Sequence, residues 1–164
     1  MPILAQNATV TFYSPGSARN TALKEMFTFK GDAAFIGSIF DGDHKLAGIT
    51  PNTFVTFHFP AGPHAFSGNS YSSLHSFPNH PDPSSQFPMT LANGEHYCIR
   101  VSAEYKSSTV AVPVVFIAIK SNLESVPCDQ ANKEAPHAKP VSMKRVEKDM
   151  QSFLDKSTSF SDSK

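Results

Sequence analysis

Apolar and polar residues alternate along most of the chain from Ala8 to Lys120, in short runs separated by turn residues. A period of two places successive side chains on opposite faces of a strand, so this pattern predicts β structure. The alternation is clearest in residues 53–59 and 95–103. Because strict alternation decides which face is buried, we expect one shared core to contain Val55, Phe57, Phe59, Tyr97, Ile99 and Val101.

Turn residues divide the pattern into separate strands. Asp41-Gly42-Asp43 follows an apolar run and predicts a hairpin, since glycine adopts positive φ without steric cost. Asn93-Gly94 predicts a second turn, directly before the strand at 95–103. The expected fold class is all-β: an antiparallel β-sandwich of about seven short strands over residues 8–126, with a C-terminal amphipathic helix.

A long loop is expected at residues 67–88, where Ser, Asn and Pro dominate and four prolines disfavour a regular strand or helix. Loops of this length in compact domains are usually functional or disordered. Its aromatic and imidazole side chains could stack on a neutral glycan or contact a protein surface. The binding candidates are therefore Tyr71, His75, Phe77 and His80, although the same aromatics could simply hold the loop against the domain.

The two ends of the chain lie outside the predicted sandwich. Residues 1–7 are expected to be a trimmed export signal or disordered; the less favoured alternative is that Met1 is a native start. Residues 127–140 are polar and predict a linker. Residues 141–156 predict a helix, which could pack on the sandwich or dock another subunit, and 157–164 should be a disordered tail. The apolar positions of that helix are Met143, Val146, Met150, Phe153 and Leu154.

Cys98 and Cys128 are too far apart in sequence for a Cys-x-x-Cys redox or zinc pair. They could form one structural disulfide, which requires an oxidising compartment, or remain two free thiols. The segment after the last strand could return over the face that carries Cys98 and bring Cys128 within reach.

Composition removes several classes of function. Lys plus Arg and Asp plus Glu each number 14, so the formal net charge of zero provides no field that would gather nucleic acid. The longest apolar run, 110–119, is interrupted by Pro113 and is shorter than the ~20 residues of a membrane helix. The sequence has no Gly-x-Ser-x-Gly elbow, His-Glu-x-x-His helix or phosphate-binding glycine loop. We therefore expect no enzyme activity, no cofactor, no nucleic-acid partner and no transmembrane segment.

Histidines suggest one metal site. His75, His80 and Asp82 share the 67–88 loop, and His58 and His64 flank the preceding turn. Three such groups, if they converged, would suit zinc. A Pro- and Ser-rich loop offers little of the rigid support that a preorganised site needs. We therefore expect His64 to pack in its turn, His58 to face solvent, the loop histidines to be solvated and no metal to bind.

The turn motifs resemble a family. Asp41-Gly42-Asp43, the strand 54–59, the turn Pro60-Ala61-Gly62-Pro63-His64 and the later stretch Gly94-Glu95-His96-Tyr97-Cys98-Ile99 are similar to PEGA-like and related uncharacterised β-sandwich domains of bacterial envelope proteins and lipoproteins. The similarity covers about residues 33 to 120, and the long 67–88 loop departs from it. The resemblance implies a small exported sandwich, often without known activity.

These observations favour a non-catalytic, exported envelope or extracellular domain that acts as a structural or protein-interaction module. Its partner could be another envelope protein, a second copy of the chain or a glycan. The alternative is a small carbohydrate-binding module or a metal-dependent hydrolase that uses the 67–88 loop.

Overall fold

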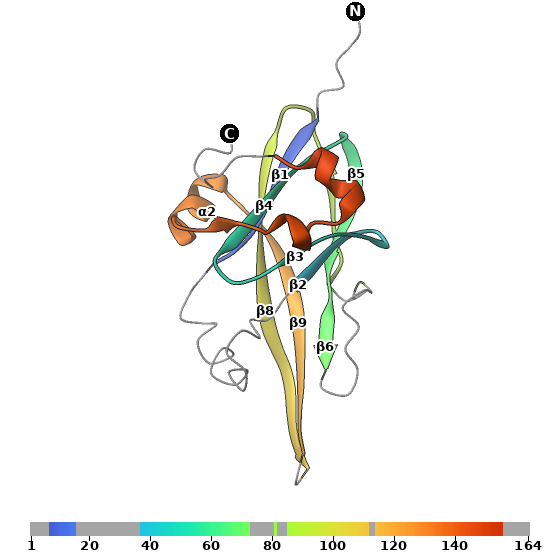
Figure 1. Ribbon diagram of the computed structural model, residues 1–164, viewed down its shortest axis with the longest axis vertical. Helices are drawn as coiled ribbons and strands as arrows, with labels where there is room; N and C mark the ends of the chain where they lie inside the picture. Colours follow the sequence, from blue (N-terminus) through green and yellow to red (C-terminus); the bar gives the residue numbers. More distant parts are fainter. Residues whose placement is uncertain (1–6, 16–36, 73–80, 82–84, 112–113, 156–164) are drawn as a thin grey trace, which may run out of the picture.

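The chain folds into two β-sheets that face each other, as shown by a computed structural model that describes residues 7–15, 37–72, 81, 85–111 and 114–155, with backbone alone for 70–72 and 103–120 (Figure 1). The larger sheet has the strand order β10-β4-β1-β8-β9-β6, and the smaller one β3-β2-β5-β7. In the larger sheet the strands are β1 (Ala8–Ser14), β4 (Thr53–Phe59), β6 (Ser70–Ser72), β8 (His96–Ala111), β9 (Val114–Val126) and β10 (Lys139–Pro140). In the smaller sheet they are β2 (Gly37–Asp41), β3 (His44–Ile49), β5 (Gly62–Gly68) and β7 (Phe87–Leu91).

This arrangement confirms the expected all-β class and corrects its details. The strands are more numerous than the seven expected, and β8 runs for 16 residues. Most pairs are antiparallel, but β1 pairs in parallel with β8, and β10 with β4. Alternation predicts strands but does not specify their partners, and β1 lies between two strands that are distant in sequence.

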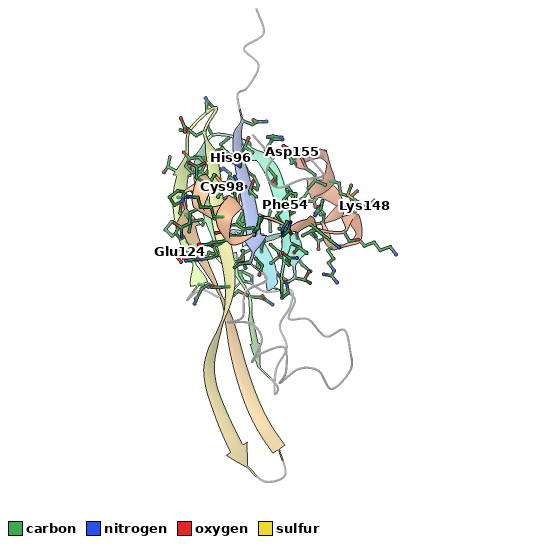
Figure 2. The ribbon with its side chains drawn as sticks, turned by 90° about the vertical axis from the view of Figure 1, so that its left-hand side faces the viewer. Phe54, His96, Cys98, Glu124, Lys148 and Asp155 are labelled. Carbon is green, nitrogen blue, oxygen red and sulfur yellow. A yellow bond between two sulfur atoms is a disulfide. The ribbon has the colours of Figure 1, made fainter. Side chains whose placement is uncertain are left out.

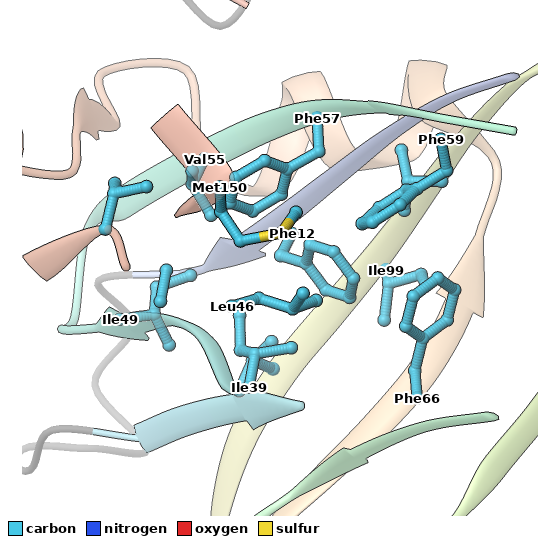
Figure 3. Close-up of a cluster of buried hydrophobic side chains, with 14 of the residues drawn as sticks. Phe12, Ile39, Leu46, Ile49, Val55, Phe57, Phe59, Phe66, Ile99 and Met150 are labelled. Atoms are coloured by element: carbon cyan, nitrogen blue, oxygen red, sulfur yellow. The ribbon is translucent and has the colours of Figure 1, made fainter. Parts of the chain in front are cut away.

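One hydrophobic core fills the space between the sheets (Figure 3). Phe12 from β1 makes an edge-to-face contact with Phe66 from β5, with ring centroids 5.2 Å apart. The expected core set is confirmed: Val55, Phe57, Phe59, Ile99 and Val101 are buried in this cluster, and the partly buried Tyr97 packs against it.

The two turn motifs contact each other. Gly42 (φ +60°) closes the predicted hairpin between β2 and β3, and Gly62 (φ +126°) opens β5. His64 Nδ1 lies 2.7 Å from Asp41 Oδ2, and His64 Nε2 lies 2.9 Å from the Pro60 carbonyl oxygen. Its ring also stacks on Phe66. His64 therefore packs within its turn.

The expected loop at 67–88 is shorter than predicted. Strand β5 continues to Gly68, β6 occupies Ser70–Ser72, and β7 begins at Phe87. Between these strands the Asn69 side-chain carbonyl accepts a hydrogen bond from the Ser38 amide at 3.0 Å, and the Ser85 hydroxyl donates to the Gly68 carbonyl at 3.0 Å. Side-chain hydrogen bonds to the backbone thus order polar residues whose composition suggested a loop.

The prediction of a helix over 141–156 is wrong. Residues 143–145 and 148–153 form two short 3-10 turns, η4 (Met143–Arg145) and η5 (Lys148–Phe153). Between and after these turns the chain is extended, and bridges join Val146 to Ala47 of β3 and Leu154 to Phe57 of β4. Because this segment pairs with strands of both sheets, its backbone satisfies strand hydrogen bonds that a helix would leave open.

The interpretation of 127–140 as a linker is also wrong, because this segment holds α2 (Cys128–Glu134) and β10. Helix α2 places the small side chain of Ala131 against the larger sheet. Ala135 and Ala138, which follow the helix, are buried with it in a second cluster that also contains Tyr13 and Phe54. Phe54 is therefore buried.

Strands β8 and β9 project from the two-sheet body as a long antiparallel ribbon (Figure 1). Strand β1 pairs with residues 96–100 of β8, and β6 pairs with residues 118–120 of β9. Between these contacts and the tip, residues 107–117 pair only within the ribbon in the described part of the chain. No helix in that part is long and apolar enough to cross a membrane.

Candidate functional site

The polar side chains of the larger sheet gather on its outer face, the side opposite the main core. Strand β1 alternates, so Thr9, Thr11 and Tyr13 point outward while Val10 and Phe12 fill the core. Register across β4, β1 and β8 arranges this face in three rows: His58, Thr9 and His96; Thr56, Thr11 and Cys98; and Phe54, Tyr13 and Arg100.

Helix α2 covers the third row. Its last residue, Glu134, accepts hydrogen bonds from the Tyr13 hydroxyl at 2.7 Å and from Arg100 Nη1 at 2.8 Å. Gln130 donates to the same carboxylate at 2.7 Å, and Arg100 also pairs with Glu124 on β9. Phe54 and Tyr13 lie beneath the helix. This end of the outer face is a closed, packed surface.

Electrostatics in the third row favour a charged Glu134 beside a neutral Tyr13. Burial alone would favour the protonated carboxyl, but hydrogen bonds from Gln130, Tyr13 and Arg100, together with the arginine charge, lower the pKa of Glu134. Burial, the hydrogen bond to Glu134 and the negative charge of that residue raise the pKa of Tyr13. The row therefore holds α2 on the sheet through charge-assisted hydrogen bonds.

In the second row the structure joins Cys98 of β8 to Cys128, the first residue of α2, in a disulfide with a Cα–Cα distance of 5.2 Å. Cys98 is buried, with 1% of its surface exposed, and Cys128 is half-buried. The bond attaches the N-terminal end of α2 to the sheet, while Glu134 attaches its C-terminal end.

His96 stands beside this disulfide, two residues before Cys98 on the same face of β8 (Figure 2). Its Nε2 lies 4.0 Å from Cys98 Sγ and 2.9 Å from the Thr11 hydroxyl oxygen. Burial lowers the pKa of His96, the Asp155 charge opposes that shift, and His58 adds to it. The neutral imidazole is therefore favoured.

The first row continues this polar network towards β4. His58 Nδ1 lies 3.2 Å from the Thr9 hydroxyl oxygen, and its Nε2 lies 3.5 Å from Asp155 Oδ2. The Asp155 amide donates to the Thr56 carbonyl at 2.8 Å, which fixes the C-terminal segment beside this row. Every buried side-chain nitrogen or oxygen of the described residues has a hydrogen-bond partner.

The ligand atoms of His96, Cys98 and Cys128 all lie within 4.8 Å of one another. An imidazole nitrogen and two thiolates are a donor set that suits zinc and other borderline or soft metal ions. While the sulfurs are bonded to each other they are not thiolates. The cluster is thus a structural disulfide in its oxidised form and a set of three metal donors once reduced.

The candidate residues named from the sequence are not brought to this cluster. Tyr71 lies in β6, where it pairs with Ile119 of β9. The other binding and metal candidates lie outside the described residues and stay predictions: His75, Phe77, His80 and Asp82. Sequence reasoning considered Cys98 and Cys128 as a disulfide or as two free thiols, and did not consider His96 as a metal ligand. The pattern His-x-Cys, which places both side chains on one face of a strand, could have indicated this pair of donors. The third donor, Cys128, begins a helix in the segment that the sequence predicted to be a linker.

No protein-family model, no curated protein and no solved structure matches the chain. The PEGA-like relationship indicated by the turn motifs stays a prediction.

Proposed function

We propose that the chain is a non-catalytic β-sandwich of an exported envelope or extracellular protein, which binds a protein partner through the projecting β8–β9 ribbon. The observation that carries this proposal is the ribbon itself. It continues past its last contacts with the body, to a register in which Val110 pairs with Val115 and Ala111 with Val114.

Two properties of the ribbon favour an interaction role. An isolated two-stranded ribbon is at best marginally stable in water, and its unpaired edges offer N–H and C=O groups to another strand. Residues 107–119 also contain no Asp, Glu, Lys or Arg, although charged residues make up 17% of the whole chain. Charge on edge strands is a usual protection against pairing. A partner that adds a β-strand to one edge would bury this uncharged segment.

The disulfide supports the exported location. Structural disulfides persist in oxidising compartments and are rare in the cytosol. Thiol labelling of the protein in its natural compartment should leave Cys98 and Cys128 unmodified until a reductant is added. Labelling of both residues without reductant would contradict the exported location and leave the ribbon proposal in place.

Site-specific photo-crosslinking tests the ribbon. A photoreactive residue placed at Val115 or Ile117, in cells that naturally make the protein, should yield a discrete adduct larger than the chain. An adduct of twice the chain mass identifies a second copy, and any other discrete mass identifies a different protein. The same residue at Lys144, which is exposed in η4 on the body, provides the matched control.

A shortened ribbon provides the second arm. Tyr105 and Ile119 face each other in register, so an Asn-Gly turn can join them in place of residues 106–118. This variant should keep the far-ultraviolet circular dichroism of a β protein and should not co-purify with the crosslinked partner. Absence of ribbon adducts, or equal adducts from the Lys144 position, would overturn the proposal.

A further inference from the structure

We propose that, when the Cys98–Cys128 disulfide is reduced, the two cysteines and His96 bind one zinc-like divalent metal ion, so that disulfide and metal are mutually exclusive states of one site. The proposal is independent of the ribbon and depends on three side chains from two elements, β8 and the start of α2.

The spacing of the donors fits a tetrahedral ion. With zinc–sulfur and zinc–nitrogen bonds of about 2.3 and 2.0 Å, tetrahedral angles place a sulfur and a nitrogen about 3.5 Å apart and two sulfurs about 3.8 Å apart. His96 Nε2 is already 4.0 Å from Cys98 Sγ, so this pair needs to close by only about 0.5 Å. The sulfurs must separate once their bond is broken, and Cys128 can provide that movement because it begins a helix and is half-buried.

The surroundings of His96 prepare it to act as a ligand. Thr11 hydrogen-bonds to Nε2, the same nitrogen that faces Cys98, and the Thr11 hydroxyl oxygen also lies 2.8 Å from that of Thr56. This chain of hydroxyls fixes the orientation of the imidazole ring in the metal-free protein, with Nε2 towards Cys98. A metal at Nε2 would displace Thr11 from that nitrogen, and Thr11 would keep its contact with Thr56. Three protein donors and a solvent water on the half-exposed side complete four-coordination.

The chemistry balances with a named reductant. A dithiol transfers two electrons and two protons to the disulfide, which becomes two thiols, while the dithiol becomes a disulfide. The metal ion then replaces the two thiol protons, which are released to solvent, and accepts a lone pair from each thiolate and from neutral His96. Reoxidation of the cysteines removes both thiolates and releases the ion.

Cobalt(II) and zinc(II) are the probes. The protein is reduced with a phosphine, which becomes phosphine oxide by taking oxygen from water, and the reagent is removed without oxygen. Cobalt(II) should then produce a near-ultraviolet thiolate charge-transfer band, zinc should displace it, and native mass spectrometry should show one ion per chain. The oxidised protein should show neither the band nor the added mass.

Variants separate this site from adventitious binding. Loss of an outer-shell partner alone weakens metal sites about 10–100-fold, so loss of a ligand in His96→Gln or Cys128→Ser should weaken zinc binding at least tenfold. His58→Gln is the matched control, because His58 lies on the same face in the first row but outside the cluster. It should change the affinity by less than about twofold.

Three results would overturn the proposal: no ion bound by the reduced protein, equal binding by His96→Gln and the unmodified chain, or loss of β-type circular dichroism on reduction. Because the two ligand variants change different elements, failure of one to fold leaves the other as the test.

Discussion

Removing the disulfide should cost a large share of the stability of the fold. Cys98 and Cys128 are separated by 30 positions. For a loop of that length, the chain-entropy relation gives about 12 cal/mol/K, or about 3.6 kcal/mol at 25 °C. Domains are typically stable by only about 5–15 kcal/mol. We therefore expect the variant Cys98→Ala/Cys128→Ser to remain folded with a much lower free energy of unfolding.

Urea unfolding followed by circular dichroism measures this change. The midpoint should fall, and the melting temperature should drop by about 7 to 14 °C, since 1 kcal/mol corresponds to about 2–4 °C in a domain of this size. The unmodified chain after reduction is the control, because it loses the bond without losing the buried Cys98 side chain. Both forms should lose similar amounts.

A loss below about 1 kcal/mol in both forms would refute the reasoning. It would mean that the Glu134 hydrogen bonds and the buried alanines hold α2 in place without the covalent link, and that the reduced, unfolded chain is already restricted near these cysteines. A large loss in the double variant alone would assign the effect to the cavity at Cys98 instead.

Three further predictions concern the core, a close strand contact and pH. Phe57→Ala should lower the free energy of unfolding by about 3–5 kcal/mol in urea titration, because Phe57 is fully buried between Phe12 and Phe59; a loss below 1 kcal/mol would reject its core role. Gly68→Ala should cost about 1–3 kcal/mol, because its Cβ would lie 2.5 Å from Ser121 Cβ; the added change Ser121→Gly should recover part of that loss in a double-mutant cycle. Burial lowers the pKa of His96 in the folded protein, so the unfolded chain takes up the proton first and stability should fall as pH drops below about 6.5. His96→Gln should make the free energy of unfolding fall less steeply with pH, and an unchanged pH dependence would contradict the lowered pKa of His96.

Alternation in the sequence was sufficient to predict the core-facing side chains of two strands, but not the whole core. In β4 and in residues 97–101 of β8 every second side chain is apolar, and the buried face is the one expected. The glycine turns at Gly42 and Gly94 were predictable for a local reason, since both adopt positive φ. Both the alternation and the turns depend on residues that are close together in the sequence, so they can be predicted from one sequence.

Features that depend on distant partners were not predictable in this way. The spacing of Val146, Met150 and Leu154 indicated a buried face, and all three do contact the core. The same spacing suits an extended chain interrupted by short turns. The chain is extended rather than helical because Val146 and Leu154 form bridges with Ala47 of β3 and Phe57 of β4. Helix α2 was missed because its one buried residue is Ala131, and a single alanine barely registers in a hydrophobic pattern.

The candidate site was predicted in part for the same reason. The sequence suggested that Cys128 could return over the outer face of the strand that carries Cys98. It did not show that Thr11 contacts His96 on that face, because this contact follows from the parallel pairing of β1 with β8. Parallel neighbours are joined through long connections, so no local pattern announces them.

Strand β8 contributes both to the proposed partner-binding ribbon and to the proposed metal site, and the two proposals can be tested independently. Cys98 lies at the base of the ribbon, where β1 pairs with residues 96–100 through the backbone and Arg100 contacts both α2 and β9. Reduction of the disulfide frees the start of α2 but breaks none of these backbone bonds. The ribbon therefore keeps its attachment to the body in either redox state. Photo-crosslinking from Val115 should accordingly give the same adduct before and after reduction, whereas the metal signal at His96 should change between the two.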